Sequence, residues 1–278
     1  MSPINPPPPT SFAQLSFPAP GVVLVTYNRP EKLNCTRAAD VVELTRIFQW
    51  IDEEPTLSVA IITGAGDRAF STGADLTEWQ SKISGPGAQA QPGAGPGDVP
   101  GAIPLSNRVG KKPVIAAVNG LALGGGCETI VNCDIVVAAD TATFGLVEVK
   151  RGVAPYAGVL PRLIRTLGLQ RASELALTGT TFTATQAHTW GLVNKVVPRQ
   201  TLLDEAVRYA TLIAENSPDS IICTRAGLRQ GWETASVVEA TRITGQKEWA
   251  DLQRGENIVE GLRAFKERRK PNWVPSKL

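Results

Sequence analysis

The stretch PVIAAVNGLALGGGCE, at residues 113–128, decides the fold of this chain. Residues 113–118 are apolar and partly β-branched, a pattern that predicts a buried strand. A glycine-rich turn follows at residues 119–126, and a helix is expected from about Cys127. Because another apolar run at residues 134–138 predicts the next strand, strand and helix alternate here, which is typical of an α/β protein.

The same alternation precedes this stretch. Residues 21–27 (GVVLVTY) and 58–63 (SVAIIT) are predicted strands, and residues 38–54 between them form a predicted amphipathic helix. This order of strand, helix and strand indicates a parallel pair. Residues 84–104 are crowded with Gly, Pro and Ala and are predicted to form a mobile loop, either a lid over a site or a disordered insertion.

Helical patterns dominate the chain after about Gly191. They cover residues 202–215, 220–229, 235–254 and 256–270. The prediction is therefore a core at residues 12–198 and a helical carboxyl-terminal region at residues 199–273. A proline-rich segment at residues 1–11 is expected to precede them as a disordered tail.

The composition restricts the possible functions. The 278 residues are 42% hydrophobic and 19% charged with a net charge of +2, so no surplus of positive charge indicates a nucleic-acid partner. No segment reads as a membrane span, and the amino terminus is unlike a signal peptide, so we expect no membrane partner. The four cysteines lack paired metal-ligand spacing, so no metal is expected.

His188 is the only histidine of the chain. A single histidine rules out a Ser-His-Asp triad and a Cys-His pair, so proton transfer would depend on carboxylates. His188 itself lies in a predicted helical stretch at residues 184–190, where we expect it to cap or pack.

The chain ends in Ser276, Lys277 and Leu278. This tripeptide is the address that the peroxisomal import receptor reads at an exposed carboxyl terminus. We therefore expect residues 274–278 to be a targeting tail and the protein to be peroxisomal. A chance tripeptide in a cytoplasmic protein is the alternative.

Three segments could carry chemistry, and the first lies at residues 119–128. Its three consecutive glycines allow backbone amides to approach a ligand at a helix start, where unpaired N–H groups and the helix dipole favour an anion. Glu128 lies beside them. Triple glycine also occurs where a helix only packs closely against a sheet, and this is the alternative.

The second and third segments are residues 69–76 (AFSTGADL) and 142–149 (ATFGLVEV). The amides of the second could join those of the first in binding one oxygen, or the segment is an ordinary turn with Asp75 as a helix cap. The third places Glu148 among apolar residues, where a raised proton affinity would suit a general acid. A solvated loop glutamate is the alternative.

Together these segments resemble the crotonase family, also called the enoyl-CoA hydratase/isomerase superfamily, over about residues 12–273. Residues 28–34 (NRPEKLN) are similar to the CoA-contacting turn of the family, and residues 261–270 (GLRAFKERRK) to its final helix. The resemblance implies an α/β, crotonase-like fold, with a spiral core of ββα units and a helical carboxyl-terminal trimerisation region.

The resemblance also implies roles for individual residues. The amides of Ala74 and Gly125 would form an oxyanion hole for a thioester carbonyl, and Glu128 and Glu148 match the two glutamates of the hydratases. The residues expected to contact the substrate are Lys32, Leu33, Asp75, Leu76, Tyr156, Phe265 and Arg268.

The segment that holds Tyr156 departs from the family pattern. Residues 155–162 read PYAGVLPR, where the family commonly has small, glycine-rich residues. Tyr156 and Val159 therefore bring bulk near the expected acyl site. Either they reshape the pocket, with the Tyr156 hydroxyl contacting a polar acyl group, or both pack in the core.

Two carboxylates and two amides suffice to add water across a conjugated thioester, because the reaction needs a base, an acid and donors for the enolate oxygen. The predicted function is reversible hydration of a 2-enoyl-CoA, or dehydration of a 3-hydroxyacyl-CoA. In hydration Glu128 would hold the water and Glu148 would deliver the α proton. No cofactor is expected besides the CoA of the substrate, and the family implies a homotrimer or a dimer of trimers.

Three alternative functions stay open. The first is an enoyl-CoA double-bond isomerase, which shuttles a proton without water. The second is a specialised peroxisomal dehydratase, such as one that dehydrates mevalonyl-CoA in siderophore assembly. The third is a non-catalytic CoA-binding scaffold on the same fold.

Overall fold

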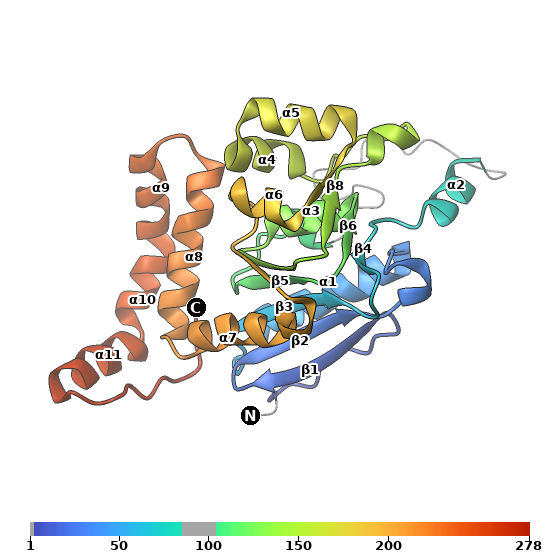
Figure 1. The fold of residues 1–278 in the computed structure, drawn as a ribbon. Helices are drawn as coiled ribbons and strands as arrows, with labels where there is room; N and C mark the ends of the chain where they lie inside the picture. Colours follow the sequence, from blue (N-terminus) through green and yellow to red (C-terminus); the bar gives the residue numbers. More distant parts are fainter. Residues whose placement is uncertain (1–2, 85–103) are drawn as a thin grey trace.

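Within residues 3–84 and 104–278, the part of the chain that the computed structural model describes, the strands form a six-stranded and a four-stranded sheet (Figure 1). The larger sheet has the order β1-β2-β3-β5-β7-β10. Its first two strands are antiparallel, and every later pair is parallel. Its strands are β1 (Ala13–Ala19), β2 (Val22–Tyr27), β3 (Val59–Gly64), β5 (Val114–Val118), β7 (Ile135–Ala139) and β10 (Lys195–Val197).

The smaller sheet is built from strands of three residues. They are β4 (Ala69–Ser71), β6 (Leu121–Leu123), β8 (Thr143–Gly145) and β9 (Thr181–Thr183). The strands β4, β6 and β8 are parallel neighbours, and β9 lies antiparallel to β8. These strands were absent from the sequence prediction, because three residues are too few to show a period of two.

The two sheets are connected as a spiral. Three times the chain passes from a strand of the larger sheet to one of the smaller sheet, from β3 to β4, from β5 to β6 and from β7 to β8. Because β4, β6 and β8 are parallel neighbours, their carboxyl ends lie at one edge of the smaller sheet. The loops that leave these three ends are therefore brought together, although they are far apart in the sequence.

The predicted parallel pair with a helical crossover is confirmed. β2 is parallel to β3, and α1 (Ala38–Glu53) connects them. Leu44, Ile47, Phe48 and Ile51 recur at helical spacing on one face of α1 and are buried in the core. Each such side chain contributes about 1.5–3 kcal/mol on burial, so this face fixes α1 on the sheet.

The remaining helices of the core lie around the smaller sheet, except α2, which extends away from it at the edge of the molecule (Figure 1). They are α2 (Leu76–Ser84), α3 (Gly125–Asn132), α4 (Val159–Leu167), α5 (Leu169–Thr178) and α6 (Ala184–Thr189). Helix α3 begins at Gly125, two residues before the predicted start, because Gly124 takes a positive φ of 55° that turns the chain into the helix. His188, near the end of α6, has Nδ1 2.9 Å from the Val193 carbonyl and so takes part in local packing.

The carboxyl-terminal region is helical, as predicted. Helix α7 (Leu202–Ala214) packs against the larger sheet, and the later helices extend to one side of the core (Figure 1). They are α8 (Pro218–Glu233), α9 (Val237–Thr244), α10 (Ala250–Arg254) and α11 (Glu256–Glu267), and a π-helical turn (Gly245–Trp249) joins α9 to α10. Arg225 and Arg229 of α8 hold Asp134 at 3.0 and 2.8 Å, which fixes this region on the core.

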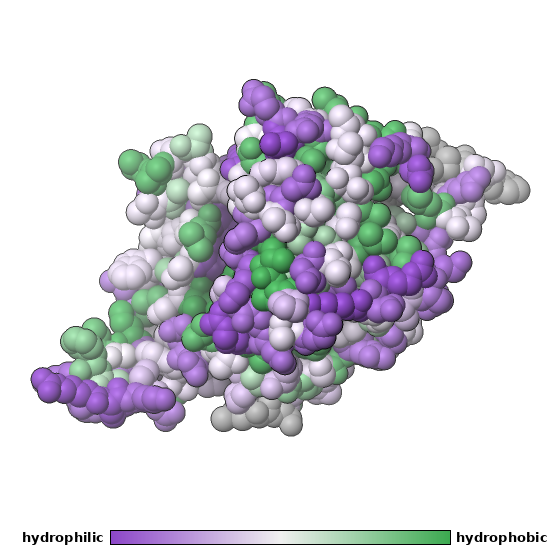
Figure 2. All heavy atoms as spheres, viewed as in Figure 1, coloured by the Kyte–Doolittle hydropathy of each residue, from purple (hydrophilic) through white to green (hydrophobic). Residues whose placement is uncertain are grey.

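Large apolar side chains are exposed on these outer helices, as Figure 2 shows on the same side of the molecule. Val237 and Val238 of α9 are 81% and 79% exposed, and Phe265 of α11 is 86% exposed. Among the described residues, no helix is both long and apolar enough to cross a bilayer.

The proline-rich segment follows the surface of α1. The amides of Ile4 and Asn5 donate to the Glu54 carboxylate at 3.0 and 2.9 Å, and Ser11 binds Glu43. These bonds hold the described residues of the expected disordered tail against the core. The predicted mobile loop at residues 84–104 lies, from 85 to 103, outside the described residues.

Candidate active site

The loops from the three turns of the spiral enclose one cavity of about 380 Å³. Thr72 and Ala74 come from the loop after β4, Gly124, Gly125 and Glu128 from the segment after β6, and Val147 and Glu148 from the segment after β8. The other lining residues are Leu76, Trp79, Arg151, Val153, Ala154, Tyr156 and Ala157. Both predicted glutamates and both predicted amide positions therefore line a single cavity.

The amides of Ala74 and Gly125 are open. Thr36 forms a parallel bridge with Ala74, in which the Thr36 amide donates to the Gly73 carbonyl and the Asp75 amide donates to the Thr36 carbonyl. In this pattern the N–H of Ala74 points away from Thr36. Gly125 is the first residue of α3, so its amide has no acceptor within the helix. Neither amide donates to another residue of the described part, and both residues border the cavity.

Two glycines allow the amide loops to approach each other. A side chain at Gly73, where φ is 83°, would place its Cβ 2.6 Å from the Gly125 nitrogen. A Cβ at Gly126 would meet the Ser71 carbonyl oxygen at 2.2 Å. The glycines therefore do more than pack a helix on a sheet, because they also keep the face of the Gly125 amide clear.

Glu128 is buried in the first turn of α3, with 4% of its surface exposed. Its Oε1 accepts a hydrogen bond of 3.3 Å from the Ala157 amide. Burial, followed by the negative charge of Glu148, raises the pKa of Glu128 to about 7, although the Ala157 amide and the Arg162 charge act in the opposite direction. Glu128 therefore titrates near neutral pH, where a group can both give and take a proton.

Glu148 begins the 3₁₀ turn η3 (Glu148–Arg151), directly after β8. Burial raises the pKa of its carboxyl group. Its Oε2 is buried without a hydrogen-bond partner in the described part of the chain, and Oε1 lies 3.4 Å from the point where a Cβ of Gly124 would be. A carboxylate oxygen buried without a donor is costly, so it marks a position for a ligand.

The two glutamates behave as a pair. Both are withdrawn from water in one cavity, and a charge on one disfavours a charge on the other. The pair consequently retains a proton well above the pH at which a solvated carboxyl group loses it. One member can then act as an acid while the other acts as a base.

Of the other residues predicted to contact a substrate, some line the cavity and others have structural roles. Leu76 and Tyr156 line the cavity and are exposed. The Asp75 carboxylate binds Arg29 at 2.9 Å and accepts a hydrogen bond from the Thr77 amide at 3.1 Å. Asp75 therefore caps the amino terminus of α2, which was the alternative prediction for this residue. Val159 is fully buried in the core, so at this position the structure confirms core packing and not a reshaped pocket.

Lys32 and Leu33 lie beside the cavity rather than in its wall. Lys32 ends a 3₁₀ turn (Pro30–Lys32) and is exposed, and Leu33 takes a left-handed φ of 54°. The carbonyl of Leu33 accepts from the Thr72 amide at 3.1 Å, which ties this turn to the first amide loop.

Phe265 and Arg268 are not brought to the cavity of their own chain. They lie on α11 and at its end, on the side of the molecule opposite α2 (Figure 1). Both are exposed. Any contact of these residues with a ligand of the cavity would have to be made in another copy of the chain.

Four functional candidates were missed in the sequence. Trp79, Arg151 and Val153 line the cavity, and the Ala157 amide holds Glu128. Only their closeness in sequence to Asp75, Glu148 and Tyr156 could have indicated them. No residue pattern shows which side of a turn faces a cavity.

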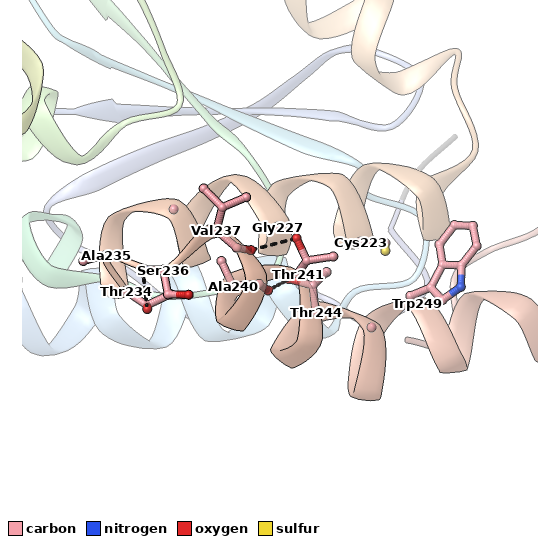
Figure 3. A pocket seen from close by; sticks show the side chains of 12 residues that line it. Cys223, Gly227, Thr234, Ala235, Ser236, Val237, Ala240, Thr241, Thr244 and Trp249 are labelled. Carbon is pink, nitrogen blue, oxygen red and sulfur yellow. Dashed lines mark hydrogen bonds between the residues drawn. The ribbon is translucent and has the colours of Figure 1, made fainter.

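A larger pocket of about 620 Å³ lies elsewhere, between α8 and α9 (Figure 3). Its lining is mainly small and hydroxylated, with Gly227, Ser236 and Thr241 among its residues, and Trp249 stands at one end. Apart from the Cys223 thiol, no lining residue has an ionisable side chain. The pocket offers no acid–base pair, so we assign the active site to the smaller cavity that holds Glu128 and Glu148.

The spiral of ββα units, with two open amides, the buried Glu128 and the half-buried Glu148 at one sheet edge, defines a crotonase-like protein. The family model described as "Enoyl-CoA hydratase/isomerase" matches residues 19–276, and the chain belongs to this family. This confirms the predicted fold and family.

Curated relatives and solved structures agree with this assignment. The chain is 53% identical over 264 residues to the mevalonyl-coenzyme A hydratase of Aspergillus fumigatus, covering 95% of both chains. It is 48% identical over 277 residues to the mevalonyl-coenzyme A hydratase of Beauveria bassiana, covering 98% of both. The crystal structure of an enoyl-CoA hydratase from Bacillus anthracis matches with a TM-score of 0.84 and 32% identity, covering 96% of this chain and all of that one (100%). The chain is thus a hydratase-type member, a hydro-lyase.

Proposed function

We propose that this hydro-lyase acts on mevalonyl-CoA, which it dehydrates reversibly to the conjugated thioester. The observation that carries the proposal is the single cavity lined by two open amides, the buried Glu128 and the half-buried Glu148. The branched substrate is supported by the two relatives whose names specify mevalonyl-coenzyme A. These relatives cover nearly the whole of this chain.

The site supplies each group that the dehydration needs. The thioester oxygen binds the amides of Ala74 and Gly125, which stabilise the negative charge that this oxygen gains as the α proton leaves. Glu148 takes the α proton, and the enolate expels the β hydroxyl, which receives a proton from Glu128 and leaves as water. Hydration is the reverse, with Glu128 taking a proton from water and Glu148 returning one to the α carbon.

The protonation of the free pair supports this assignment. Dehydration begins with Glu148 ionised and Glu128 protonated. Because the pKa of Glu128 is raised to about 7, partly by the charge of Glu148, this arrangement is favoured below neutral pH. The rate of dehydration should then fall as the pH rises through the ionisation of Glu128.

The wall of the cavity suits a branched acyl group with a polar end. Trp79, Val147 and Val153 form apolar surface near the glutamates. Tyr156 and Arg151 add a hydroxyl and a guanidinium on the exposed side. The methyl branch of a mevalonyl group can contact the apolar surface, and its terminal hydroxyl can bind the Tyr156 hydroxyl or the Arg151 guanidinium.

A substrate panel tests the proposal. We expect mevalonyl-CoA to be converted to a product with the absorbance of a conjugated thioester, and to be preferred to unbranched 3-hydroxybutyryl-CoA. Oxygen from isotope-labelled water should enter the product of the reverse reaction. Turnover without this label would show an isomerase instead, and thioester binding without any turnover would show a scaffold. Turnover of unbranched substrates alone would contradict the proposed substrate.

We also propose a homotrimer or a dimer of trimers, with CoA entering only as part of the substrate. The exposed Val237, Val238 and Phe265 of the outer helices support an assembly, because a neighbouring copy would remove these large apolar side chains from water. The distance of Phe265 from the cavity of its own chain fits a role in a neighbouring copy. Sedimentation equilibrium of the full chain would measure the mass, and a monomer would contradict the proposal.

We propose a peroxisomal location, which rests on Ser276, Lys277 and Leu278. Removing these three residues should move an amino-terminally labelled protein from peroxisomes to the cytosol, as observed by fluorescence microscopy, because the receptor reads the free carboxyl terminus. Lys111→Ala is the matched control, since its Nζ contacts the Leu278 carbonyl at 2.5 Å without being part of the tripeptide. An unchanged location of the truncated protein would contradict the proposal.

A further inference from the structure

Arg162 contacts two segments that pack near the helix of Glu128 or donate to its carboxyl group. It lies on α4, and its Nη1 donates to the Ser106 carbonyl at 2.8 Å, while Nη2 donates to Asn107 Oδ1 at 3.1 Å. Ser106 and Asn107 belong to the 3₁₀ turn η2 (Pro104–Asn107), which packs on α3, the helix of Glu128. Arg162 therefore ties the start of α4 to the helix that carries the catalytic carboxyl group.

Gly158 leaves the space that this guanidinium occupies. It is the N-cap residue of α4, with a φ of 86°, and a Cβ there would lie 2.3 Å from Arg162 Nη1. The same Cβ would lie 3.1 Å from Asn107 Oδ1. The guanidinium thus lies directly against the backbone of the turn at residues 156–158, whose middle amide, that of Ala157, donates to Glu128.

We propose that Arg162 is a positioning residue: it holds the turn at residues 156–158 against η2, so that the Ala157 amide stays on Glu128 and a positive charge stays near this carboxyl group. The inference rests on the proposed function for its catalytic meaning, because it concerns the group that exchanges a proton with water.

The charges around the two groups set the direction of the effect. Glu128 faces Glu148 from η3 and Arg162 from α4, and Arg151 lines the same cavity. Arg162 in turn faces Arg229 and Glu233 of α8 and Arg165 of its own helix. The amide of Ala157 and the charge of Arg162 both lower the pKa of Glu128. Losing either one favours the protonated form and so raises this pKa.

The pH profile of kcat/KM tests the proposal, because it reports the ionisations of the free enzyme. In Arg162→Met, the high-pH limb of dehydration and the low-pH limb of hydration should both move upward by roughly half to one pH unit. Both limbs reflect the ionisation of Glu128, which must be protonated for dehydration and ionised for hydration. Arg162→Lys keeps the charge but not the forked contact, so a smaller shift is expected.

Two further variants complete the design. Arg165→Met removes an exposed arginine from the same helix and should leave both limbs in place. Gly158→Ala should move them in the same direction as Arg162→Met, because its Cβ displaces Nη1. A rate that falls equally at every pH, with both limbs unmoved, would show a structural role only and overturn the proposal.

A measurement without turnover separates this inference from the proposed function. In protein labelled with carboxyl ¹³C-glutamate, the signal that is lost in Glu128→Gln identifies Glu128. Its titration midpoint should rise in Arg162→Met and stay unchanged in Arg165→Met. If the wild-type protein were inactive on every thioester, this titration would still decide the role of Arg162, and an unmoved midpoint would reject it.

Discussion

Replacing Glu148 with glutamine is expected to lower the rate of dehydration and hydration by roughly 10²- to 10⁴-fold, the contribution of a positioned acid–base group. Glutamine keeps the shape of the side chain but cannot accept the α proton. Within the described part of the chain, Glu148 Oε2 is buried without a hydrogen-bond partner, which makes Glu148 the group best placed to meet a reacting atom. The measurement is kcat with mevalonyl-CoA, followed at the absorbance of the conjugated thioester.

The control is Glu174→Gln on α5, which removes an exposed carboxylate that forms an ion pair with Arg171 outside the cavity and should leave the rate unchanged. The affinity of the Glu148→Gln protein for a non-reactive CoA thioester should also be close to that of the wild type, because the thioester oxygen binds backbone amides. Near-normal turnover by Glu148→Gln would contradict the proposed mechanism.

Gly73→Ala should abolish most of the activity by a different route. The new Cβ would lie 2.6 Å from the Gly125 nitrogen, over the amide that the thioester oxygen needs. Loss of one oxyanion donor lowers kcat by about 10²- to 10³-fold. Since φ is 83° at this position, the substitution should also destabilise the fold by roughly 1–2 kcal/mol. Turnover and thermal unfolding are measured together.

Gly168→Ala is the control that separates the effect of backbone strain from the effect of blocking the Gly125 amide. Gly168 has a similar φ of 79°, but apart from its chain neighbours no atom of the described residues lies within 4 Å of the position of its Cβ. It should therefore lose stability through backbone strain alone and retain its activity. A Gly73→Ala protein as active as Gly168→Ala would show that the Gly125 amide is not required.

The sequence predicts the long elements of the fold and misses the short ones. β2, β3 and α1 have enough apolar positions to reveal their period and were found close to their observed bounds. β4, β6, β8 and β9 have three residues each and are defined by their neighbours in space. These short strands bring the site together, so the arrangement of the site depends on the part of the fold with the weakest local signal.

The residues of the candidate site likewise fall into those that the sequence predicts and those that it does not. Glu128, Glu148 and the glycines carry their chemistry in their own residue types, so they could be predicted. Asp75 could not be assigned, because an aspartate after a strand can contact a ligand or cap a helix, and only the bonds to Arg29 and Thr77 decide. Arg162 gave no signal at all, since its importance comes from Gly158 and Ser106, of which Ser106 lies 56 residues away along the chain.

The spiral connection of the sheets has a consequence for how such an enzyme can change during evolution. Each turn of the spiral contributes one separate loop to the cavity, and the oxygen-binding groups are backbone amides, whereas the proton carriers are side chains. Substitution of Glu128 or Glu148 therefore alters proton transfer and leaves the binding of the thioester oxygen in place. A descendant of this chain can therefore lose the handling of water and still stabilise an enolate, which makes the scaffold a starting point for other reactions of thioesters.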